Sequence, residues 1–426
     1  MPAIRALVVG ASIAGPSAAY WLAKAGVQVT VIERFPSLRT GGQNIDIRTV
    51  GVEVMRKIPG MEDAVRAKKY HIDGISLVRS DGRPYGVLKP TGNPDQQTLV
   101  SEYEILRGDL SEILYGLTKD NGNVKYVFGE QVTAIQQPAD GGPVTVEFAN
   151  GLPASEYDLV VACDGTTSRT RAIGLGCGVR DYTISTNSWA AYFSTPRDLL
   201  QGSKIGEGFN SPGGRMMAVA PDASEGNRII LMSAYPSGDR DATVPFREAL
   251  KQGDQKLKEF VARRHENTGW KDTQVIQALM EADDLYASEV MQVKAPHLYK
   301  GRFVMVGDAG YATGLTGLGT SLAMAGAYVL AGEISKHDGD IAAGLRDYEE
   351  RMQSLVGEIG QMPRFVTTFM APQTAWAIWL RNNIFAFVMW TGVLDFITRF
   401  MASGFHKTNK DILPHYSGIV EANNRR

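Results

Sequence analysis

The sequence predicts an α/β protein (α+β overall) in which a nucleotide-binding domain is interrupted by an antiparallel β-sheet domain and followed by a long helical segment. Three observations support this prediction: a glycine-rich strand–helix–strand opening, a β-rich stretch over about 183–235, and a buried strand with a second glycine-rich loop near 303. We expect a Rossmann-like domain of residues 1–72, 98–180 and 285–362, an inserted domain of 73–97 and 181–284, and a helical brace of 363–426.

The opening element combines a buried strand over 4–9, a helix over 13–25 and a second strand over 27–32. The turn between strand and helix reads Gly10-Ala-Ser12-Ile13-Ala14-Gly15. Gly10 permits a tight turn, Gly15 permits close helix–strand packing, and the helix N-terminus offers N–H groups to a pyrophosphate. Ser12 replaces the usual middle glycine and can donate a hydrogen bond to phosphate. Glu33 ends the second strand, where a carboxylate can accept a hydrogen bond from a ribose hydroxyl. This carboxylate disfavours a ligand with a 2′-phosphate, although the adjacent Arg34 leaves such a ligand as an alternative.

Two further turns each follow a buried strand. Asp164 and Gly165 follow the strand over 159–162, and Gly307 and Asp308 follow the strand over 303–306. Because the carboxyl ends of parallel strands meet at one edge of a sheet, the turns can converge on one ligand. The glycines at 314, 317 and 319 permit close backbone approach to a planar ring, and the helix over 319–334 directs its positive end at an anion there.

The remaining patterns predict the other elements. Helical spacing covers 101–118, 245–264 and 272–281, and 341–401 is expected to be almost wholly helical. Strands are expected at 124–128, 144–148, 189–193, 216–220 and 229–234. The alternation in the first strand of the inserted domain puts Trp189 and Phe193 on one face and Tyr192 on the other. The apolar window over 384–394 is too short to span a bilayer.

Composition excludes several classes of protein. The 44 Lys+Arg and 46 Asp+Glu side chains nearly balance, so the net charge produces no field that would attract nucleic acid or anionic lipid. The two cysteines have no metal-site or disulfide-framework spacing, which indicates a reducing compartment, and no metal site is expected. The first residues run directly into a strand without a signal-peptide pattern. We therefore expect a cytoplasmic protein without a transmembrane segment, either a monomer or a homodimer.

The three turns together resemble the fingerprints of single-component (group A) flavoprotein monooxygenases, the family of p-hydroxybenzoate hydroxylase, and are most similar to the tetracycline-inactivating monooxygenases. The resemblance covers nearly the whole chain, including 41–48, 104–110 and 318–323. It implies non-covalent FAD, with Glu33 at the ribose, Arg107 at the phosphate or ribityl region, Asp308 at the ribityl or pyrophosphate portion and Arg48 near the isoalloxazine. It also implies a cofactor-lining set of Gly10, Ser12, Ile13, Ala14, Gly15, Arg34, Gly42, Asp164, Gly317, Leu318, Gly319 and Thr320.

One departure concerns the turn at Asp308. The family pattern continues with a histidine and one or two prolines, whereas this chain has Tyr311 and no proline before Gly319. The departure predicts a shorter or looser loop beside the flavin.

The resemblance also implies the reaction. NADPH or NADH reduces the flavin and departs, O₂ forms a C4a-hydroperoxide, and its distal oxygen passes to a phenolic, aromatic or polyketide-like substrate. By correspondence with the tetracycline-inactivating enzymes, the inserted domain supplies substrate-facing positions at Tyr192, Arg215 and Tyr235, with Met216, Met217 and Met232 as an apolar wall. Ordinary sheet packing is the competing interpretation of each. No general base stands out, and His265 is expected on a solvated helix face.

Several alternatives stay open. A flavin-dependent reductase or halogenase would share the fold, although the Trp-x-Trp-x-Ile-Pro pattern of halogenases is absent. A non-catalytic flavin or NAD sensor is a third interpretation. The helix expected after residue 375 is interpreted as a brace across the domains, with a membrane-surface helix or a dimer contact as alternatives because Trp376, Trp379 and Trp390 suit an interface.

Overall fold

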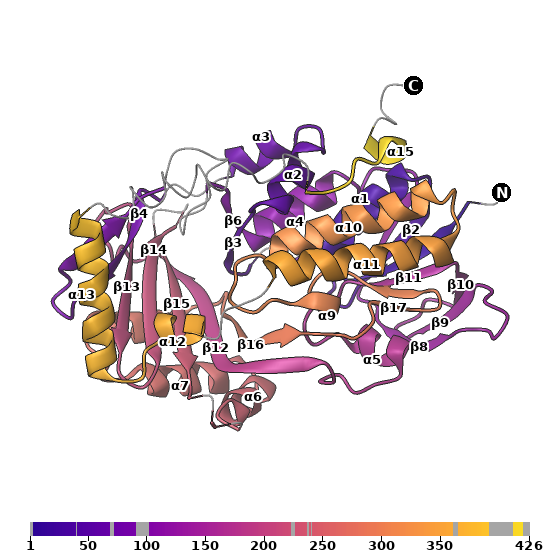
Figure 1. Ribbon diagram of the computed structural model, residues 1–426. Coiled ribbons are helices and arrows are strands. Elements are labelled where there is room, and N and C mark those ends of the chain that lie inside the picture. The colour runs from indigo at the N-terminus through magenta and orange to yellow at the C-terminus, as the bar shows by residue number, and fades with distance from the viewer. Residues whose placement is uncertain are drawn as a thin grey trace.

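The computed structural model describes residues 3–39, 41–68, 72–90, 102–222, 226–236, 238–239, 241–360, 365–391 and 412–420. Figure 1 shows two β-sheets at opposite ends of the molecule, with long helices packed on the part that holds the N-terminal strand. The α/β class expected from the sequence is confirmed, with mixed sheets and helices in the order that the motifs predicted.

A six-stranded sheet holds the N-terminal strand. Its order is β17-β18-β11-β1-β2-β7, and every neighbouring pair is parallel except β17 with β18. Strands buried on both faces read as continuous apolar runs, as β1 and β11 do. The strands are β1 (Arg5–Val9), β2 (Gln28–Glu33), β7 (Val124–Phe128), β11 (Leu159–Ala162), β17 (Tyr299–Lys300) and β18 (Phe303–Met305).

Helices pack around this sheet, with α10 at the centre of the layer. Its small residues let it contact α1, α2 and α11, and Trp21 of α1 meets Tyr328 of α10 edge-to-face at 4.9 Å between ring centroids. The helices of this part are α1 (Ala14–Lys24), α2 (Val50–Arg56), α3 (Met61–Ala67), α4 (Arg107–Gly116), α5 (Arg169–Leu175), α9 (Asp308–Tyr311), α10 (Gly319–Lys336), α11 (Ile341–Ile359) and α15 (Ser417–Val420).

Two small sheets complete this part. One has the order β10-β9-β8, with β8 (Val132–Gln136), β9 (Val144–Phe148) and β10 (Ser155–Tyr157). The other pairs β3 (Asn44–Asp46) with β6 (Glu104–Leu106). The helix expected over 101–118 is therefore wrong at its start: long-range pairing with β3 draws residues 104–106 into a strand, and α4 begins at Arg107.

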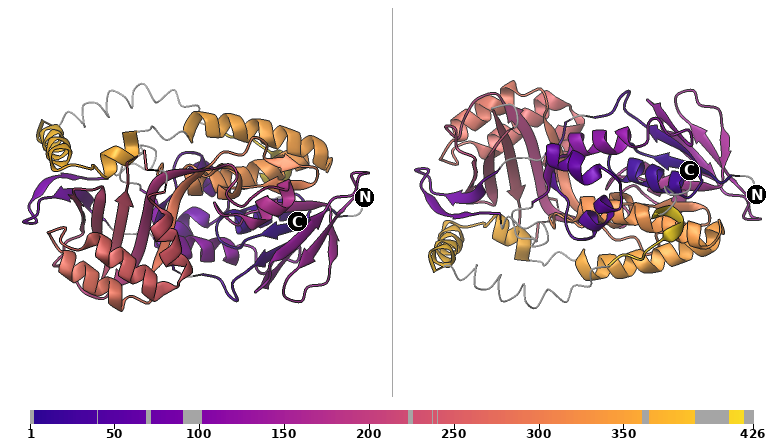
Figure 2. Two further views of the ribbon diagram at one scale, coloured as in Figure 1. Left: turned by 90° about the horizontal axis from the view of Figure 1, so that it is seen from below. Right: turned by 90° about the horizontal axis from the view of Figure 1, so that it is seen from above.

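The second large sheet has the order β16-β12-β15-β14-β13-β4-β5, antiparallel throughout except for β13 with β4. One face is covered by α6 (Val244–Lys251), α7 (Asp254–His265) and α8 (Asp272–Glu281), and Figure 2 shows α12 (Phe365–Met370) on the opposite side of the sheet. Its strands are β4 (Gly74–Val78), β5 (Pro84–Leu88), β12 (Thr183–Thr195), β13 (Ile205–Ser211), β14 (Arg215–Pro221), β15 (Asn227–Ala234) and β16 (Tyr286–Val293).

Two long helical predictions are interrupted in the structure. The stretch over 245–264 is two helices, α6 (Val244–Lys251) and α7 (Asp254–His265), because Gly253 has φ 95°, which an α-helix cannot contain. The expected helix over 272–281 is α8 (Asp272–Glu281). The stretch after 341 divides into α11, α12 (Phe365–Met370) and α13 (Ala375–Thr391), with Pro372 between the last two. Residues 392–401 of that prediction lie outside the described residues.

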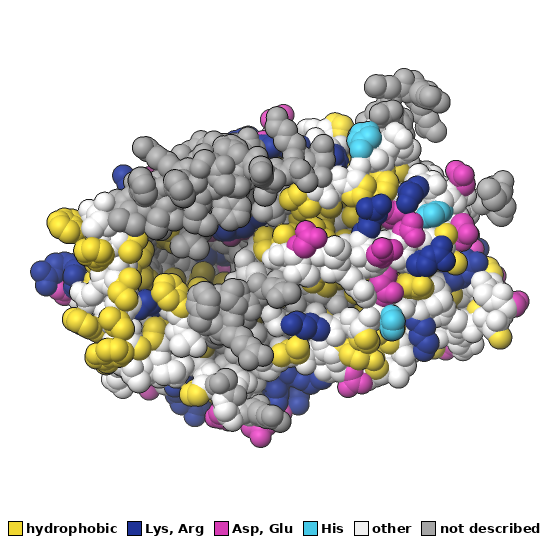
Figure 3. Space-filling model, viewed as in Figure 1, with side chains coloured by type: hydrophobic (Ala, Val, Ile, Leu, Met, Phe, Trp, Pro, Cys, Tyr) yellow, Lys and Arg dark blue, Asp and Glu magenta, His cyan; other side chains and the backbone are white. Residues whose placement is uncertain are grey.

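The last long helix, α13, packs against β5 and β13 at the edge of the seven-stranded sheet. The α13 part of the expected brace thus rests on the inserted domain, at the end of the molecule far from the N-terminus, whereas α15 packs against α10 and α1 (Figure 1). Figure 3 shows apolar side chains gathered on the outside of this helix. None of the helices in the described ranges combines the length and hydropathy needed to cross a bilayer.

Candidate functional site

Three turns meet at the carboxyl ends of β1, β11 and β18, which are neighbours in the six-stranded sheet. A Cβ on Gly10 would lie 2.7 Å from the carbonyl oxygen of Cys163, and one on Gly307 would lie 3.1 Å from the Cβ of Ala14. The glycine turn, the Asp164 turn and the Asp308 turn are therefore packed against one another. The convergence expected from the sequence is present.

Gly15 brings the first helix onto its strand. A Cβ at this position would lie 1.8 Å from the carbonyl oxygen of Gly10 and 3.4 Å from a side-chain carbon of Val8. Any larger residue would push α1 away from β1 and move the N–H groups at its start, which include those of Ile13 and Ala14.

A cleft, whose volume of about 760 Å³ includes open solvent, opens at the first two of these turns. Gly10, Ser12, Glu33 and Arg34 line it from the first βαβ unit, and Asp164, Gly165 and Thr167 line it from the second turn. A smaller hollow of about 270 Å³ continues past Ser12, Gly41 and Ser111. The two spaces share Ser12, Glu33, Arg39 and Arg107, so they form one elongated recess.

The recess has a cationic wall. Arg39 and Arg107 both line it, and the pKa of Arg39 is lowered, first because burial disfavours its charge and then because Arg107 lies nearby. Two guanidinium groups that repel each other in a shared recess favour an anion between them, and guanidinium is suited to phosphate. Arg39 belongs to none of the three motifs, and sequence reasoning missed it.

Glu33 points its carboxylate back at the glycine turn. Its Oε2 accepts a hydrogen bond from the N–H of Ala11 at 2.9 Å, and its Oε1 accepts one from the N–H of Phe35 at 3.2 Å. A carboxylate has further lone pairs for a ligand hydroxyl. Next to it, the guanidinium of Arg34 lies 4.8 Å from the centre of the Phe35 ring, which holds this arginine at the rim.

Asp164 is engaged with the helix that follows it. Its carboxylate accepts hydrogen bonds from the N–H of Thr170 at 3.1 Å and from the Thr170 hydroxyl at 2.9 Å, and also from the Ser168 hydroxyl. The carboxylate therefore shapes the turn, and the backbone around Gly165 lines the cleft.

Arg171 ties the second turn to the third. Its side chain is fully buried and donates to the carbonyl oxygens of Ala309 at 2.9 Å, Thr166 at 3.0 Å and Val179 at 2.7 Å. Ala309 directly follows Asp308, so this guanidinium fixes the distance between the two aspartate turns. The sequence placed Arg171 inside a motif but gave no sign of this contact.

Asp308 lies beside the N-terminus of α10, and its Oδ1 would be 3.4 Å from a Cβ on Gly319. The side chain is exposed, yet protein surrounds the carboxyl closely enough that burial raises its pKa, which the charge of Arg107 only partly offsets. The loop over 314–318 leads into Gly319 and Thr320 at the start of α10, next to the Arg48–Asp46 ion pair of 2.8 Å. A Cβ on Gly317 would lie 3.9 Å from Nε of Arg48.

Tyr311 occupies the position where the family pattern has a histidine. It is buried beneath α10, its hydroxyl lies 3.3 Å from that of Tyr348, and the Tyr348 hydroxyl donates to the carbonyl oxygen of Met305 at 2.7 Å. The loop that follows makes hydrogen bonds of its own, between the hydroxyls of Thr313 and Thr316 at 2.6 Å and from the Leu318 N–H to the Thr316 hydroxyl at 3.2 Å. The looser loop remains a prediction.

The face of the seven-stranded sheet that carries Tyr192 is turned toward the recess. We call this the open face and define it by Tyr192, Ala190, Met232 and Met216, which pack with Leu315 of the glycine-rich loop and with Ala371. Tyr192 lies beside Tyr286, with 6.2 Å between ring centroids, and Tyr286 lies 5.9 Å from the guanidinium of Arg107. The apolar wall that the sequence suggested at Met216 and Met232 thus faces the cofactor-binding part.

The other three substrate candidates lie on the opposite face. Met217 is buried among the side chains beneath α6, α7 and α8. Tyr235 packs there as well, accepting a hydrogen bond from Nε1 of Trp189 at 3.2 Å. Arg215 pairs with Ser233 across the strands and donates to the carbonyl oxygen of Glu266 at 3.3 Å. The prediction that Arg215, Met217 and Tyr235 face the substrate is therefore wrong, because their strands turn these side chains to the face opposite Tyr192.

His265 also corrects an expectation. It is fully buried, with ring nitrogens 3.2 Å from the Val261 carbonyl oxygen and 3.3 Å from that of Met232, and it lies edge-on to Trp189. Burial lowers its pKa to about 4, against the smaller raising effect of those carbonyls. The expected solvated helix face is wrong because α7 turns this side chain onto the sheet.

Arg228 links the two parts of the molecule. It lies at the end of β15, is buried, pairs with Asp284 at 3.1 Å and donates to the carbonyl oxygen of Gly42 at 2.6 Å. A Cβ on Gly42 would lie 3.3 Å from the Cβ of Arg107. The seven-stranded sheet therefore positions the loop that covers Arg107, a contact between distant residues that no local pattern announced.

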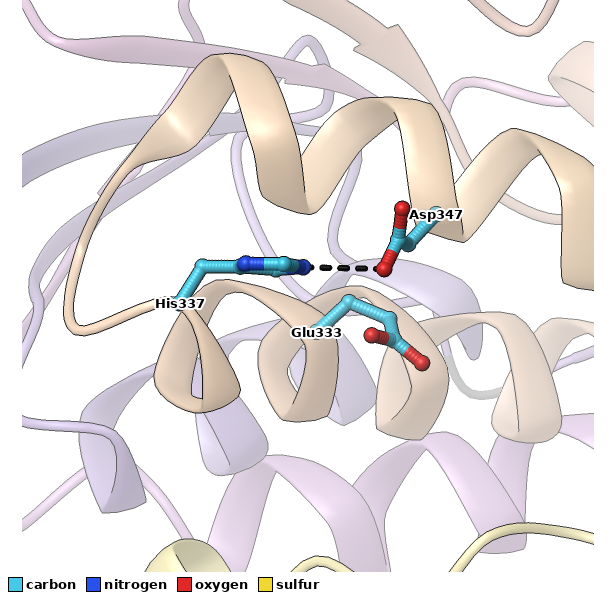
Figure 4. A group of neighbouring side chains, drawn as sticks. All are labelled: Glu333, His337 and Asp347. Atoms are coloured by element: carbon cyan, nitrogen blue, oxygen red, sulfur yellow. Dashed lines mark hydrogen bonds and ion pairs between the residues drawn. The ribbon is translucent and has the colours of Figure 1, made fainter.

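One cluster elsewhere has the composition of a metal site. Figure 4 shows Glu333, His337 and Asp347 directed toward one another from α10 and α11. Lys336 lies 3.1 Å from Glu333 and 3.2 Å from Asp347, Arg351 also pairs with Glu333, and the Tyr416 hydroxyl donates to Glu333 at 2.6 Å. These cations already balance the carboxylates, so we interpret the cluster as a clamp between helices.

Comparison with known proteins agrees with this geometry. Residues 3–355 match the family described as FAD binding domain. The chain is 32% identical over 410 residues to the FAD-dependent monooxygenase asL4 of Sarocladium schorii, covering 90% of this chain and 91% of that protein. Among solved structures it is similar to tetracycline destructase Tet(55), with a TM-score of 0.73, 30% identity and coverage of 91% and 97%. A Klebsiella pneumoniae HpxO structure complexed with FAD and uric acid shares the fold, with a TM-score of 0.68, 22% identity and coverage of 92% and 97%.

Proposed function

This chain belongs to the FAD binding domain family and is an FAD-dependent monooxygenase, and from that premise we propose that it consumes NADPH or NADH and O₂ to hydroxylate or epoxidise an electron-rich aromatic, phenolic or polyketide-like molecule. The observation that carries the proposal is the contact between the apolar open face of the second sheet and Leu315 of the glycine-rich loop, beside the turns that converge at the recess. The turns would then form the cofactor-binding wall of the site, and the open face its substrate-binding wall.

The residues of the recess fit FAD. Because Gly10 and Gly15 approach each other closely, the backbone N–H groups at the start of α1 can reach a pyrophosphate. The guanidinium groups of Arg39 and Arg107 supply positive charge for its phosphates. Glu33 would accept from the ribose, and Asp308 would bind the ribityl or pyrophosphate portion. Bound FAD supplies the redox chemistry by which two electrons from NAD(P)H reduce O₂, one oxygen atom entering the substrate and the other leaving as water.

The open face would exclude water and orient the substrate. Met216 and Met232 present flexible apolar side chains that adapt to polycyclic surfaces. Tyr192 is the polar group of this wall, and burial raises its pKa to about 12, with a smaller contribution from Tyr286. Its hydroxyl therefore stays protonated at neutral pH and can donate a hydrogen bond to a substrate oxygen, fixing which ring carbon faces the flavin.

Oxygen incorporation tests the proposal. Purified protein reconstituted with FAD is incubated in ¹⁸O₂ with NADPH or NADH and a panel of phenols and polyketides, and products are analysed by mass spectrometry. The proposal expects reductant oxidation to accelerate with particular compounds, each yielding a product that carries one ¹⁸O atom. Substrate reduction without oxygen incorporation would move the assignment to a flavin-dependent reductase, and chloride-dependent product formation would move it to a halogenase.

A pair of variants tests the orientation of the sheet. Tyr192→Phe keeps the aromatic ring but removes the hydroxyl, so we expect FAD retention with a higher KM and more reductant lost to H₂O₂. Met217→Leu changes the opposite face with little change of volume and is the matched control, with kinetics close to those of the parent protein. Equal behaviour of the two variants would contradict the assignment of the open face to the substrate.

A further inference from the structure

The helix α13 has its polar and apolar faces reversed relative to an ordinary surface helix. Arg381 and Asn382 are only 8% and 4% exposed. Arg381 donates to Oδ1 of Asn210 and to the carbonyl oxygen of Phe369, both at 2.8 Å, and to Oδ1 of Asn382 at 3.0 Å. A surface helix normally buries its apolar stripe and turns charges to water. This helix directs its charge into the protein.

The outward face of α13 is apolar and aromatic. Trp390 is 83% exposed, and the other exposed members of the stripe are Trp376, Trp379, Ile384 and Phe387, with Phe369 of α12 nearby in the chain. These six account for nearly half of the thirteen large apolar side chains that are exposed in the described part of the chain. Together they present on the order of 800 Å² of surface, from the area of an aromatic side chain and these exposures. A typical soluble monomer has a largest apolar patch of about 300–600 Å².

Two polar residues on this face, Asn383 and Thr391, are exposed, and each donates to a carbonyl oxygen of its own helix. Asn383 donates from Nδ2 to the carbonyl oxygen of Trp379 at 2.8 Å, and Thr391 donates to that of Phe387 at 2.9 Å. Arg381 is the only charged residue among the 17 residues of α13, so the outward face carries no charge. The face is therefore uncharged and largely apolar along its length.

Cationic side chains lie on the hairpin that supports this helix. α13 packs on β5, where a Cβ on Gly86 would lie 2.8 Å from Met389. The β4–β5 hairpin and the residues next to it carry Arg79, Arg83 and Lys89 against the carboxylates Asp73 and Asp81, and the 77% exposed Arg83 side chain pairs with Asp81. Positive charge beside an uncharged aromatic ridge is complementary to phospholipid, with phosphate at the level of the arginines and acyl chains at the level of the rings.

We propose that the α13 stripe, formed by Trp376, Trp379, Ile384, Phe387 and Trp390, is a docking surface for a phospholipid membrane. The helix lies in the headgroup region with its axis along the surface, and the three indoles occupy the depth that tryptophan favours. A second copy of the chain is the competing occupant. In a two-fold dimer, however, the cationic residues beside the stripe would lie opposite the same cationic residues of the other copy and repel them.

The docked orientation places a lipid surface near the apolar open face. Ala371, between α12 and α13, packs with Met232 and Ala190, and Asn210 of β13 holds both Arg381 and the carbonyl oxygen of Met370. An apolar substrate dissolved in the bilayer would thus reach the protein beside this wall. This consequence depends on the proposed function, whereas the docking does not.

Vesicle binding tests the proposal with the full-length, FAD-loaded protein. Co-sedimentation and tryptophan fluorescence are measured with vesicles of phosphatidylcholine alone and with added phosphatidylglycerol. We expect the protein to sediment with both kinds of vesicle and its tryptophan emission to shift to the blue. Binding should be stronger to the vesicles with phosphatidylglycerol, and high salt should remove only this additional binding.

Two substitutions locate the contact. Trp376→Ser with Trp390→Ser should weaken vesicle partition by about tenfold or more, since both side chains are exposed and would lose their burial in lipid. Ile184→Ser, at a side chain that is 46% exposed on β12, is the control and should leave binding unchanged. NADPH oxidation without vesicles should be the same in both variants, which separates this test from that of the proposed function.

Either of two results would overturn the proposal. One is failure of the parent protein to bind either kind of vesicle. The other is a dimer in light scattering that the tryptophan substitutions dissociate, which would assign the stripe to a second copy of the chain. Unchanged thermal unfolding of the double variant would show that weaker binding does not arise from misfolding.

Discussion

Replacing Arg171 by methionine removes the guanidinium that joins the two aspartate turns while keeping much of the side-chain volume. Three carbonyl oxygens, those of Thr166, Val179 and Ala309, would lose their buried donor. A hydrogen bond to a charged group contributes about 1.5–3 kcal/mol, but methionine also relieves the cost of burying the charge that lowers the pKa of Arg171. We expect a net loss of about 3–5 kcal/mol in the free energy of unfolding, because three buried carbonyl oxygens left without a donor cost about 1–3 kcal/mol each and the relief of the buried charge offsets part of this.

The same substitution should weaken FAD binding because Ala309 is the neighbour of Asp308. Urea unfolding is measured with and without excess FAD, which in the parent protein should add about 2.7 kcal/mol at a concentration of 100 times Kd. In Arg171→Met this increment should shrink. Arg302→Met is the matched control, since Arg302 also donates to two carbonyls, of Gly141 at 2.7 Å and Asp158 at 3.1 Å, but lies away from the cleft.

The reasoning would be refuted if Arg171→Met cost no more than Arg302→Met, for which we expect about 1 kcal/mol, and bound FAD as the parent does. That outcome would mean that the two aspartate turns hold their spacing without the guanidinium. Arg171→Lys should give an intermediate result, because one ammonium cannot reach three carbonyls in the planar arrangement of a guanidinium.

Three further predictions address the cofactor and the core. Asp308→Ala should fold but purify largely without flavin, and a parent-like visible spectrum would remove Asp308 from the site. Glu33→Ala should weaken FAD binding by about 1–3 kcal/mol, measured by flavin fluorescence, and an unchanged Kd would contradict the ribose assignment. Because the folded pKa of His265 is about 4, below its unfolded value of about 6.5, the unfolded state binds the extra proton; stability should fall by about 3 kcal/mol as pH drops from 6.5 to 4. His265→Gln should flatten that slope, and a slope equal to that of the parent would assign it to other groups.

The sequence predicted those features that depend on neighbours along the chain. Gly10 and Gly15 are needed because of contacts within one strand–helix turn, and the alternation at Trp189 and Tyr192 follows from the pleat of one strand. The convergence of the Asp308 turn with the first followed from a general rule of parallel sheets.

Features that depend on pairing between distant segments were missed or assigned wrongly. The face of the sheet on which Tyr235 lies depends on the register of β15 on β12, where Ser233 pairs with Trp189. A shift of one residue in this register would move Tyr235 to the other face. Residues 104–106 became a strand only because β3 lies beside them. Arg39 and Arg228 gained their roles from elements far away in the sequence, so no local spacing marked them.

The order of strands in the six-stranded sheet bears on how the protein is made. β1, β11 and β18 lie side by side, yet they span residues 5–9, 159–162 and 303–305. A ribosome adds about 5–20 residues per second, so roughly 10–30 s pass between the synthesis of β11 and that of β18, which pairs with its free edge. During that time the inserted sheet emerges and can fold, and the exposed strand edge is open to wrong partners. Synthesis of this enzyme is therefore expected to benefit from rapid translation between β11 and β18 and from chaperones that shield strand edges.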